Sequence, residues 1–384
     1  MANNNKHTGP NVPALRFPEF SGEWIESKLG DIADFSKGAG ISKDQRSEKG
    51  NPCILYGELY TRYKSEVITN VFSKTALPDS ELVKSKSNDI IIPASGETAE
   101  DIATARCVPF DNIMLGGDLN IIRLHEQDGK FFSYQLNGVR KYDIATVAQG
   151  VSVVHLHAGD LKGITVKYPS HIAEQEKISQ ILGLIDDRIA TQSKIIEEQE
   201  TLLKSLADRM FSENQYSCGL SELVDIVKGK QVNADTLSEE GDYYVMNGGV
   251  APSGYYSEYN VPAGSISISE GGNSCGYVQF NEKPFWSGGH CYSLRAKSDI
   301  VDYKYLYYFL KAKQSDVMEL RIGSGLPNIQ KKDIEKFTVS FPSMVQQLRY
   351  VKVLDAVSDQ LDAEKSILVL YHKQKEHLLS EMFI

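Results

Sequence analysis

The chain has 384 residues, of which 41% are hydrophobic and 24% are charged, a composition and length typical of a soluble protein with two or more globular domains. No run of about 18 apolar residues occurs, which excludes a transmembrane helix, and the opening MANNNKHTGPNVP lacks the apolar stretch of a secretory signal. The five cysteines form no CxxC pair and are odd in number, which disfavours a disulfide framework or a zinc ribbon and fits free thiols in the cytoplasm.

The net charge of −10 opposes binding to a polyanion such as DNA, because phosphate contacts favour a basic surface. The acidic residues, however, are unevenly distributed. Residues 170–214 hold five Lys or Arg against nine Asp or Glu, and residues 343–384 hold five against six. If these two stretches face protein partners, the rest of the chain is only mildly acidic.

Short elements are predicted along the first half of the chain. Residues 29–38 (LGDIADFSKG) predict a helix that ends at a Lys-Gly pair. Residues 88–96 and 112–124 are β-branched or alternating runs bounded by Gly, Asn and Pro, which predict strands. Residues 131–145 have helical spacing. The first half is therefore predicted to form a module of mixed helices and strands.

A long helix is predicted to follow this module. Residues 170–211 contain one glycine and no proline. Apolar residues recur every seven positions with a second series beside them, which is the pattern of a coiled coil over four heptads. The first series is Leu182, Ile189, Ile196, Leu203 and Met210, and the second is Ile178, Ile185, Gln192, Gln199 and Leu206.

The second half of the chain repeats the first. LGDIADFSKG returns as LSELVDIVKG (220–229), and GVSVVHLHAGDLKGITVKYPS (150–170) returns as GSGLPNIQKKDIEKFTVSFPS (323–343). Between them, Gly116-Gly117 matches Gly288-Gly289. The offset between the copies falls from 191 residues at the start to 173 near the end, so the copies differ most in their middle. Two unlike copies indicate one scaffold that carries two specificities.

The elements of the second half follow the same order. Residues 265–272 and 290–296 predict strands, and residues 303–321 predict the helical counterpart of residues 131–145. A second heptad pattern then begins after Phe341-Pro342. Its two series are Leu354, Leu361, Leu368, Lys375 and Met382, and Tyr350, Val357, Glu364, Tyr371 and Leu378.

Four polar residues interrupt the two heptad patterns: Gln192, Gln199, Glu364 and Lys375. Buried polar residues at such positions cost stability and fix the register of paired helices. Partial exposure in an imperfect coiled coil is the alternative, and the pattern does not decide between the two.

The predicted fold is α+β, with two mixed α/β modules in pseudo-repeat separated by two long coiled-coil helices. The first module takes residues 1–169 and the first long helix residues 170–214. The second module takes residues 215–342 and the second long helix residues 343–384.

Signatures of catalysis are absent from the sequence. Asn51-Pro52 continues as Cys-Ile rather than the (D/N)PP(Y/F) of adenine methyltransferases, and no GxxxxGK[ST] phosphate loop occurs. His155-x-His157 has no third ligand nearby, which favours a structural role over a metal site. Asp186-Asp187 is interpreted as surface charge on the first long helix. We therefore expect no catalytic residues and no metal site.

The sequence resembles the specificity subunits of type I restriction-modification enzymes. VPALRFPEFSGEW (12–24), followed by LGDIADFSKG, is similar to the N-terminus of this family. The starts of the long helices (Pro169 to Gln175, Pro342 to Gln347) and their closing Met-Phe pairs are similar too. The pseudo-repeat covers the whole chain, although the second module keeps only QYSCG in place of the RFPEF lead-in.

This resemblance implies that each module is a target recognition domain that reads one half of a split, asymmetric site in double-stranded DNA. It implies that the long helices are antiparallel, set the spacer between the half-sites and dock two methyltransferase (modification) subunits, which endonuclease/translocase (restriction) subunits then join. The chain would be a non-catalytic cytoplasmic subunit in defence against foreign DNA. It would bind no cofactor, while its partners would use S-adenosylmethionine, ATP and Mg for adenine methylation and restriction.

Candidate DNA contacts are selected by residue type and position. YGELYTRYK (56–64) interleaves tyrosines with basic residues that bond phosphates or guanine edges, or else packs on a core. The Lys-Gly pairs of both halves either touch phosphate or cap helices, and the polar loops 93–101 and 269–276 either reach bases or are simple turns. The candidates are Lys37, Tyr56, Tyr60, Arg62, Tyr63, Lys64, Ser95, Glu97, Thr98, Lys228, Asn273 and Ser274.

The heptad residues of the two long helices are the candidates for docking the partner subunits. They are Leu182, Ile189, Ile196, Leu203, Leu354, Leu361 and Leu368.

Two other classes of function remain open at this point. A coiled-coil scaffold with two heads that bind protein or sugar would account for the long helices and the acidity. An enzyme with an embedded methyltransferase or nuclease activity is the second. Salt-dependent DNA binding would favour the DNA-reading function over the scaffold. Binding of a methyl donor by the isolated chain would favour the enzyme.

Overall fold

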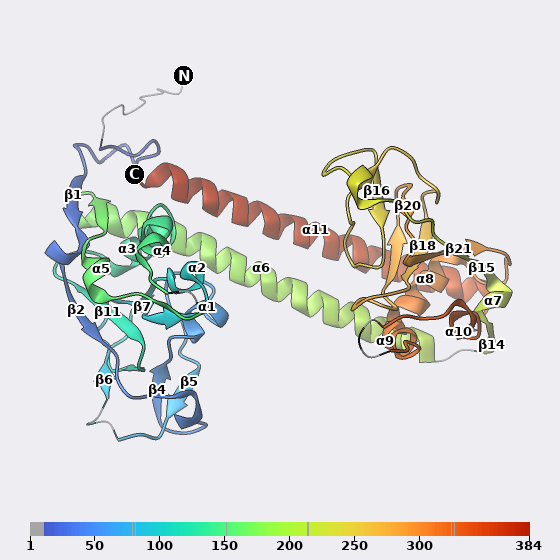
Figure 1. Cartoon of the computed structure of the whole chain (residues 1–384), viewed down its shortest axis with the longest axis horizontal. Helices are drawn as coiled ribbons and strands as arrows, with labels where there is room; N and C mark the ends of the chain where they lie inside the picture. Colours follow the sequence, from blue (N-terminus) through green and yellow to red (C-terminus); the bar gives the residue numbers. More distant parts are fainter. Residues whose placement is uncertain are drawn as a thin grey trace. The chain divides into compact units, whose positions relative to one another are not determined.

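The computed structural model describes residues 11–78, 80, 82–150, 152–212, 215–323, 325 and 327–384. They form two compact units (Figure 1). Unit 1 contains the described residues up to Ser193 together with Ile367–Ile384, and unit 2 contains Lys194–Ser366. The two long helices, α6 (Ile172–Ser212) and α11 (Met344–Met382), each contribute one part to both units. Within the described ranges, no helix has both the length and the apolar character needed to cross a membrane.

The strands of unit 1 are β1 (Ile25–Lys28), β2 (Ala33–Lys37), β3 (Arg46–Ser47), β4 (Asn51–Ile54), β5 (Ser73–Thr75), β6 (Val83–Lys84), β7 (Asp89–Pro93), β8 (Ser95–Gly96), β9 (Arg106–Val108), β10 (Met114–Leu115), β11 (Leu119–Leu124), β12 (Val154–His155) and β13 (Thr165–Tyr168). Its shorter helices are η1 (Leu29–Asp31), η2 (Lys43–Gln45), α1 (Glu58–Thr61), α2 (Ala99–Ile102), α3 (Gly129–Asn137), α4 (Lys141–Val147) and α5 (Ala158–Lys162).

Unit 1 is organised around two sheets. The first is antiparallel, with the strand order β2-β11-β7-β9. The second has the order β3-β5-β4-β10-β6, in which β4 and β10 run parallel and the other neighbours antiparallel. Two short antiparallel pairs, β1-β13 and β8-β12, complete the unit.

The strands of unit 2 are β14 (Tyr216–Gly219), β15 (Val224–Lys228), β16 (Tyr243–Met246), β17 (Tyr255–Tyr256), β18 (Ser265–Ser269), β19 (Val278–Asn281), β20 (Trp286–Ser287), β21 (Cys291–Ala296) and β22 (Thr338–Phe341). Its shorter helices are α7 (Leu220–Leu223), η4 (Ala234–Thr236), α8 (Tyr303–Ala312), α9 (Gln314–Glu319) and α10 (Lys331–Glu335).

Unit 2 repeats the topology of unit 1. Its antiparallel sheet, β15-β21-β18-β19, matches β2-β11-β7-β9 strand for strand. Its smaller sheet, β17-β16-β20, matches β5-β4-β10 and keeps the parallel pair, now formed by β16 and β20. The structure has strands in the segments predicted as strands, 88–96, 112–124, 265–272 and 290–296, and helices in those predicted as helical, 131–145 and 303–321. The segments 88–96 and 112–124 each hold two short strands, and each helical segment is divided into two helices, α3 and α4 in unit 1 and α8 and α9 in unit 2.

Each unit has a core that includes both long helices. In unit 1, Leu182 near the start of α6 packs in one cluster with Met382 at the end of α11. In unit 2, Phe211 at the end of α6 packs in one cluster with Leu354 near the start of α11. In both units the beginning of one long helix therefore lies with the end of the other, so the two helices run antiparallel, as the family resemblance implied.

The helix predicted at residues 29–38 is wrong. Residues 29–31 form the single turn η1 and residues 33–37 form strand β2; in unit 2, the short helix α7 is followed by strand β15. The physical reason is the alternation of burial: in β15, Val224 and Ile226 face the core while Asp225 and Val227 are exposed.

The glycines that follow β2 and β15 are not helix caps. A Cβ atom on Gly38 would lie 1.9 Å from the carbonyl oxygen of Gly116, and one on Gly229 would lie 2.1 Å from that of Gly288. Real side chains cannot approach a backbone oxygen so closely. Both positions therefore require glycine because two chain segments touch there through their backbones.

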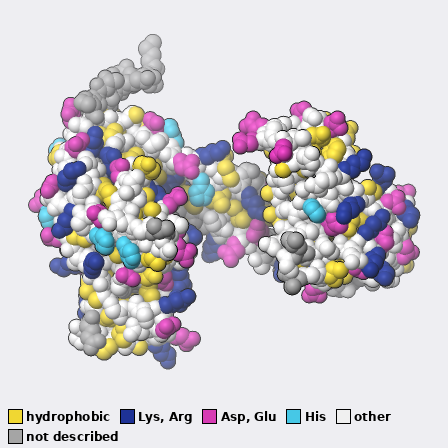
Figure 2. Space-filling view, viewed as in Figure 1, with side chains coloured by type: hydrophobic (Ala, Val, Ile, Leu, Met, Phe, Trp, Pro, Cys, Tyr) yellow, Lys and Arg dark blue, Asp and Glu magenta, His cyan; other side chains and the backbone are white. Residues whose placement is uncertain are grey.

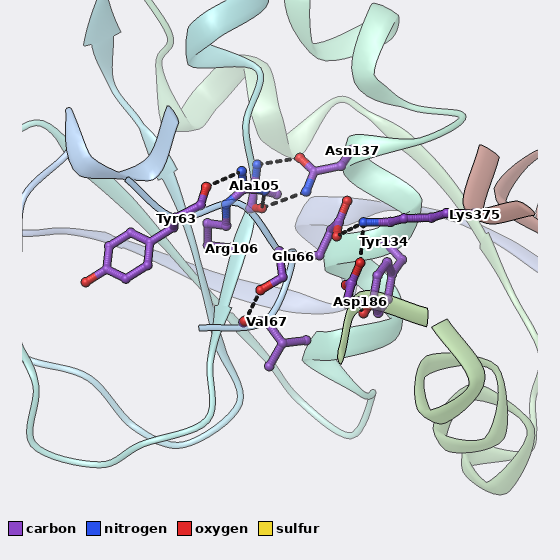
Figure 3. A network of polar contacts seen from close by, with 10 residues as sticks. Tyr63, Glu66, Val67, Ala105, Arg106, Tyr134, Asn137, Asp186 and Lys375 are labelled. Carbon is purple, nitrogen blue, oxygen red and sulfur yellow. Dashed lines mark hydrogen bonds and ion pairs between the residues drawn. The ribbon is translucent and has the colours of Figure 1, made fainter. Parts of the chain in front are cut away.

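A buried network of charges holds the end of α11 against unit 1 (Figure 3). The Lys375 ammonium lies 2.5 Å from a carboxylate oxygen of Glu66 and 2.7 Å from one of Asp186, with all three side chains 10–13% exposed. The Tyr134 hydroxyl donates to Asp186 at 2.7 Å. Lys375 is thus buried and paired, and the interpretation of Asp186 as surface charge is wrong, because α11 and α3 cover it.

We expect Gly38→Ala to lower the free energy of unfolding of unit 1 by about 1–3 kcal/mol, because the Gly116 carbonyl lies in a loop that is hydrogen-bonded to Ile54 and cannot move without disturbing that contact. Gly159→Ala is the matched control, since nothing lies within 4 Å of its Cβ. Denaturant unfolding of a Trp286→Phe background leaves Trp24, buried in unit 1, as the reporter. Equal midpoints for the two alanine variants would contradict the proposed backbone contact.

We expect Lys375→Met to destabilise unit 1 by about 3 kcal/mol or more at neutral pH, because two buried carboxylates lose their cation. Burial already raises the pKa of Glu66 above its usual value. The folded variant therefore binds a proton at Glu66 more readily than the unfolded chain does. The loss of unfolding free energy relative to the parent protein is thus smallest at acidic pH and grows as pH rises through the raised pKa. Unfolding followed through Trp24 between pH 4.5 and 8 measures this slope.

Lys373→Met, at an exposed position on the same helix, is the control for this variant. It should leave both the stability and its pH dependence within about 0.5 kcal/mol of the parent. A Lys375→Met deficit that does not change with pH would rule out the carboxylates as its cause.

Candidate nucleic-acid interface

Units 1 and 2 share one backbone framework where the loops between their two sheets meet. In unit 1, the amide of Gly38 donates to Leu119 O at 2.9 Å, and the amide of Gly116 donates to Ile54 O at 2.9 Å. The equivalent bonds of unit 2 run from Gly229 to Cys291 O and from Gly288 to Met246 O, both at 2.8 Å. The matched glycine pairs of the sequence therefore occupy the same structural position.

The polar loops that follow β7 and β18 are held in the same way. The amide of Ala94 donates to Asp118 O at 2.7 Å, and the amide of Glu270 donates to His290 O at 2.9 Å. The carbonyl of Ala94 accepts from Leu156 and that of Glu270 from Ile329, at 2.9 and 2.8 Å. Equivalent positions in the two units can thus be assigned from hydrogen bonds alone.

The side chains at these equivalent positions differ. Ala94 of unit 1 stands where unit 2 has Glu270, and Asp118 stands where unit 2 has His290. Leu55 of unit 1, which follows Ile54, stands where unit 2 has Asn247. A common framework that presents different functional groups is what two readers of different sequences require.

In unit 1 the framework borders a cavity of about 770 Å³. Its walls come from η2, the end of β4, α1 and the loop before β11, and they include basic, acidic and aromatic side chains. The lining residues are Gly40, Ile41, Ser42, Lys43, Gln45, Arg46, Leu55, Tyr56, Gly57, Glu58, Thr61, Gly117 and Asp118.

In unit 2 the equivalent loops border a cavity of about 690 Å³. Its lining is more polar in character, with two asparagines, a histidine and a Lys-Glu pair among glycines. The lining residues are Lys228, Asn247, Gly248, Gly249, Ser253, Glu270, Gly271, Gly272, His290, Pro327 and Asn328.

Glu270 is the most constrained group of the unit 2 cavity. Its Oε1 lies 2.6 Å from the Lys228 ammonium and accepts a hydrogen bond from the Tyr292 hydroxyl at 2.9 Å. Burial and this hydrogen bond raise the pKa of Tyr292, which keeps its hydroxyl protonated and donating. The side chain of Glu270 is 13% exposed and lines the cavity, while its Oε2 is buried and has no hydrogen-bond partner among the described residues.

Several predicted contact residues of unit 1 are available at the surface. Tyr56 lines the cavity, and Lys37, Lys64 and Glu97 are exposed. Arg62 is also exposed, with its guanidinium 4.2 Å above the ring of Phe72. These five residues remain candidates for contact with DNA.

The four other predicted residues of unit 1 have structural roles or are partly buried. Tyr63 and Ser95 are only 5% and 8% exposed, so neither side chain is free to reach a ligand. Thr98 is the N-cap of α2, where its hydroxyl accepts from the Asp101 amide at 3.1 Å. Tyr60 is half-buried on α1, and burial raises its pKa. The segment 56–64 therefore contains a helical turn with one exposed side, while its other side, with Leu59 and Tyr63, packs in the core.

In unit 2, Lys228 lines the cavity and Asn273 is exposed beside it in the loop after β18, while Ser274 is half-buried. Sequence reasoning missed Asn247, Glu270, His290 and Asn328. His290 directly follows the matched Gly288-Gly289 pair, which was a usable signal. Glu270 lies in the polar loop 269–276 that the sequence singled out, but its role was missed because its partners Lys228 and Tyr292 come from β15 and β21.

The predicted docking residues are largely unavailable to a partner protein. Leu182 and Leu354 are fully buried, and Ile196 and Leu361 are 9% and 6% exposed, because the apolar heptad positions pack inward. Ile189, Leu203 and Leu368 are half-buried. The docking assignment is corrected for the four buried residues. The exposed apolar residues of the long helices beyond their first residues are Leu184, Leu202, Val345, Leu348, Val353, Ile367, Val369 and Leu370.

Charge on the surface is mixed. On the face shown in Figure 2, Lys and Arg side chains lie among Asp and Glu side chains on both units. The modules therefore combine basic groups that neutralise phosphate with acidic groups that repel it, which restricts where a DNA backbone can lie.

Comparison with known proteins agrees with this architecture. The model of a family described as the type I restriction modification DNA specificity domain matches residues 21–201 and again residues 216–370. A Mycoplasma genitalium protein named as a type I specificity subunit is 24% identical over 281 residues, in an alignment that covers 69% of this chain and 73% of that protein.

Two solved structures share the fold. The crystal structure of the S subunit of a type I restriction-modification system from M. genitalium has a TM-score of 0.72 at 21% identity, covering 97% of this chain and 99% of that chain. A chain from a structure of complex assembly in a type I system has a TM-score of 0.55 at 15% identity, covering 94% of this chain and 97% of that chain. The two family matches span most of the sequence, and the chain belongs to the type I restriction-modification specificity subunits, with two DNA specificity domains in tandem.

Proposed function

We propose that this chain reads a bipartite, asymmetric sequence in double-stranded DNA, with one half-site bound by each unit. The observation that carries the proposal is the repeated framework: the same backbone hydrogen bonds border a cavity in each unit, while the side chains over them differ. Identical side chains would predict a palindromic target. Different ones predict two unrelated half-sites.

The chemistry belongs to the partners in this proposal. Two methyltransferase subunits use S-adenosylmethionine to methylate adenine, and endonuclease/translocase subunits use ATP and Mg for restriction. The chain itself is non-catalytic and holds no cofactor. Its five free cysteines suit a cytoplasmic complex, and burial raises the pKa of Cys53 and Cys291 to about 11, which keeps these thiols protonated and unreactive.

Exposed apolar residues on α11 give each unit a place to dock a methyltransferase subunit. Ile367 and Leu370 are 38% and 62% exposed in unit 1, and Val345 and Leu348 are 62% and 52% exposed in unit 2. Each pair has i, i+3 spacing, so its two side chains share one face of the helix. Exposed apolar groups of this kind are common at surfaces that partners cover.

The test of the proposed function is methylome sequencing of a methylation-free host that expresses this chain with the modification subunits of its own system. We expect one split motif with different half-sites and methylated adenine on both strands. A soluble complex that methylates nothing would contradict the proposal and favour a scaffold. A palindromic motif would contradict the assignment of different half-sites to the two units.

Ile367→Asp combined with Leu370→Asp should weaken assembly with the modification subunits about tenfold or more, because charges replace exposed apolar side chains that the docked subunit would bury. Co-purification and sedimentation of the mixed subunits measure this. Gln374→Asp, at an exposed polar position of the same helix, is the control and should assemble normally. Normal assembly of the double variant would remove this face of α11 from the docking surface.

A further inference from the structure

A Lys-Glu pair in the cavity of unit 2 has no counterpart in unit 1. We propose that Lys228 and Glu270 together read one C·G base pair in the half-site bound by unit 2. This inference rests on the proposed function and deepens it, since it names the base pair that one side-chain pair selects.

The first step is the acceptor that Glu270 offers. Its Oε1 is held by the Lys228 ammonium at 2.6 Å and by the Tyr292 hydroxyl at 2.9 Å. Its Oε2 accepts no hydrogen bond from the described residues, and the His290 Nδ1 lies 3.9 Å away, beyond hydrogen-bond reach. The buried Oε2 of this carboxylate in the cavity wall is therefore an unpaired acceptor, which the N–H group of a ligand entering the cavity would satisfy.

The second step is the donor beside that acceptor. Lys228 is 55% exposed at the end of β15, and an ammonium carries three protons. One proton is directed at Glu270, so others are free for a ligand. The pair thus presents a cationic donor next to an anionic acceptor, both at the wall of one cavity.

The third step is the match with the edges of the base pairs. In the major groove, cytosine offers the N4 amino group as a donor, and its guanine partner offers O6 and N7 as acceptors. Glu270 fits the first and Lys228 fits the second. Adenine also offers an amino group, but its neighbouring N7 is an acceptor that a carboxylate repels, and thymine adds O4 and a methyl group. The complementary pair is therefore C·G.

A phosphate contact does not explain this pair. The carboxylate of Glu270 repels phosphate, and the charge of Lys228 is already partly neutralised by its ion pair with Glu270. A purely stabilising role is a poor account too, because more than half of the Lys228 side chain is exposed to solvent, and exposed ion pairs contribute little to stability.

Unit 1 shows what the framework looks like without the pair. Lys37 occupies the position of Lys228, at the end of β2, but Ala94 stands at the position of Glu270. Unit 1 therefore keeps the cation but lacks a carboxylate that could accept from the cytosine amino group. We expect no preference for cytosine at the equivalent position of its half-site. The difference makes the two half-sites unlike at this position.

The experiment selects DNA from a random pool with the full chain in complex with its modification subunits. The wild-type complex should enrich a split motif that contains a C·G pair in one half-site. Glu270→Gln replaces the carboxylate by an amide that pairs with adenine N6 and N7. It should lower the preference for C·G over A·T at that one position by roughly tenfold to a hundredfold. Every other position, including the whole second half-site, should stay unchanged.

Asp225→Asn on the same strand β15 is the matched control, since it removes the same charge from an exposed residue of unit 2 that lies outside the cavity lining. It should leave the motif unchanged. If the Glu270→Gln complex enriches no motif, the same selection is made with Lys228→Met, which keeps the aliphatic part of the side chain and loses only the donor. A lower preference for C·G at that one position is then the expected result.

The outcomes separate this inference from the proposed function. If the wild-type complex enriches no motif, the proposed function fails. If it enriches a split motif that Glu270→Gln leaves intact at every position, the proposed function stands and the reading by Lys228 and Glu270 is overturned. If both half-sites change together in the variant, the effect is on folding or assembly, and an unchanged motif with Lys228→Met then overturns the inference.

Discussion

The close approach of two backbone segments in each unit is the constraint on which the candidate site depends. Gly38 lies against Gly116, and Gly229 lies against Gly288, at distances that no Cβ atom allows. This contact joins the end of the first strand of the antiparallel sheet to the loop before its second. Because the contact is made by backbone atoms, it is independent of the neighbouring side chains. Those side chains are therefore free to differ between the units without changing the framework.

The long helices contribute in a different way. They carry little of the site themselves, but each enters the cores of both units, with Leu182 buried in one and Phe211 in the other. The ion network of Lys375, Glu66 and Asp186 adds a directional constraint to the apolar packing at the end of α11. Charges that must pair with particular partners tolerate a shift of helix register poorly, whereas apolar side chains tolerate it better.

The sequence predicted much of this fold because its signals are periodic and occur twice. Alternating runs predicted the inner strands β7, β11, β18 and β21 of the antiparallel sheets, the heptads predicted α6 and α11, and the repeat showed which segments are equivalent. The segment 29–38 was mistaken for a helix because its glycine resembles a cap. Its true role depends on Gly116, more than 70 residues away, which no local pattern reports.

The candidate site was less accessible to sequence reasoning for the same reason. Tyr63 and Ser95 have the residue types of DNA contacts, but the fold buries them. No local pattern distinguishes Glu270 from the other residues of its loop. Its role depends on Lys228 and Tyr292, which contact its carboxylate from two other strands. The heptad leucines and isoleucines were predicted to dock partner subunits, but four of the seven are buried within the chain itself.

The central claim is that one framework holds a reading site in each unit. A structure of the assembled complex on its own target DNA tests it most directly. The account predicts that base edges of one half-site lie within hydrogen-bond distance of the unit 1 cavity around Tyr56 and Asp118, and those of the other within the same distance of Glu270 and His290. DNA bound to one unit alone, or held by surfaces that leave both cavities empty, would contradict it.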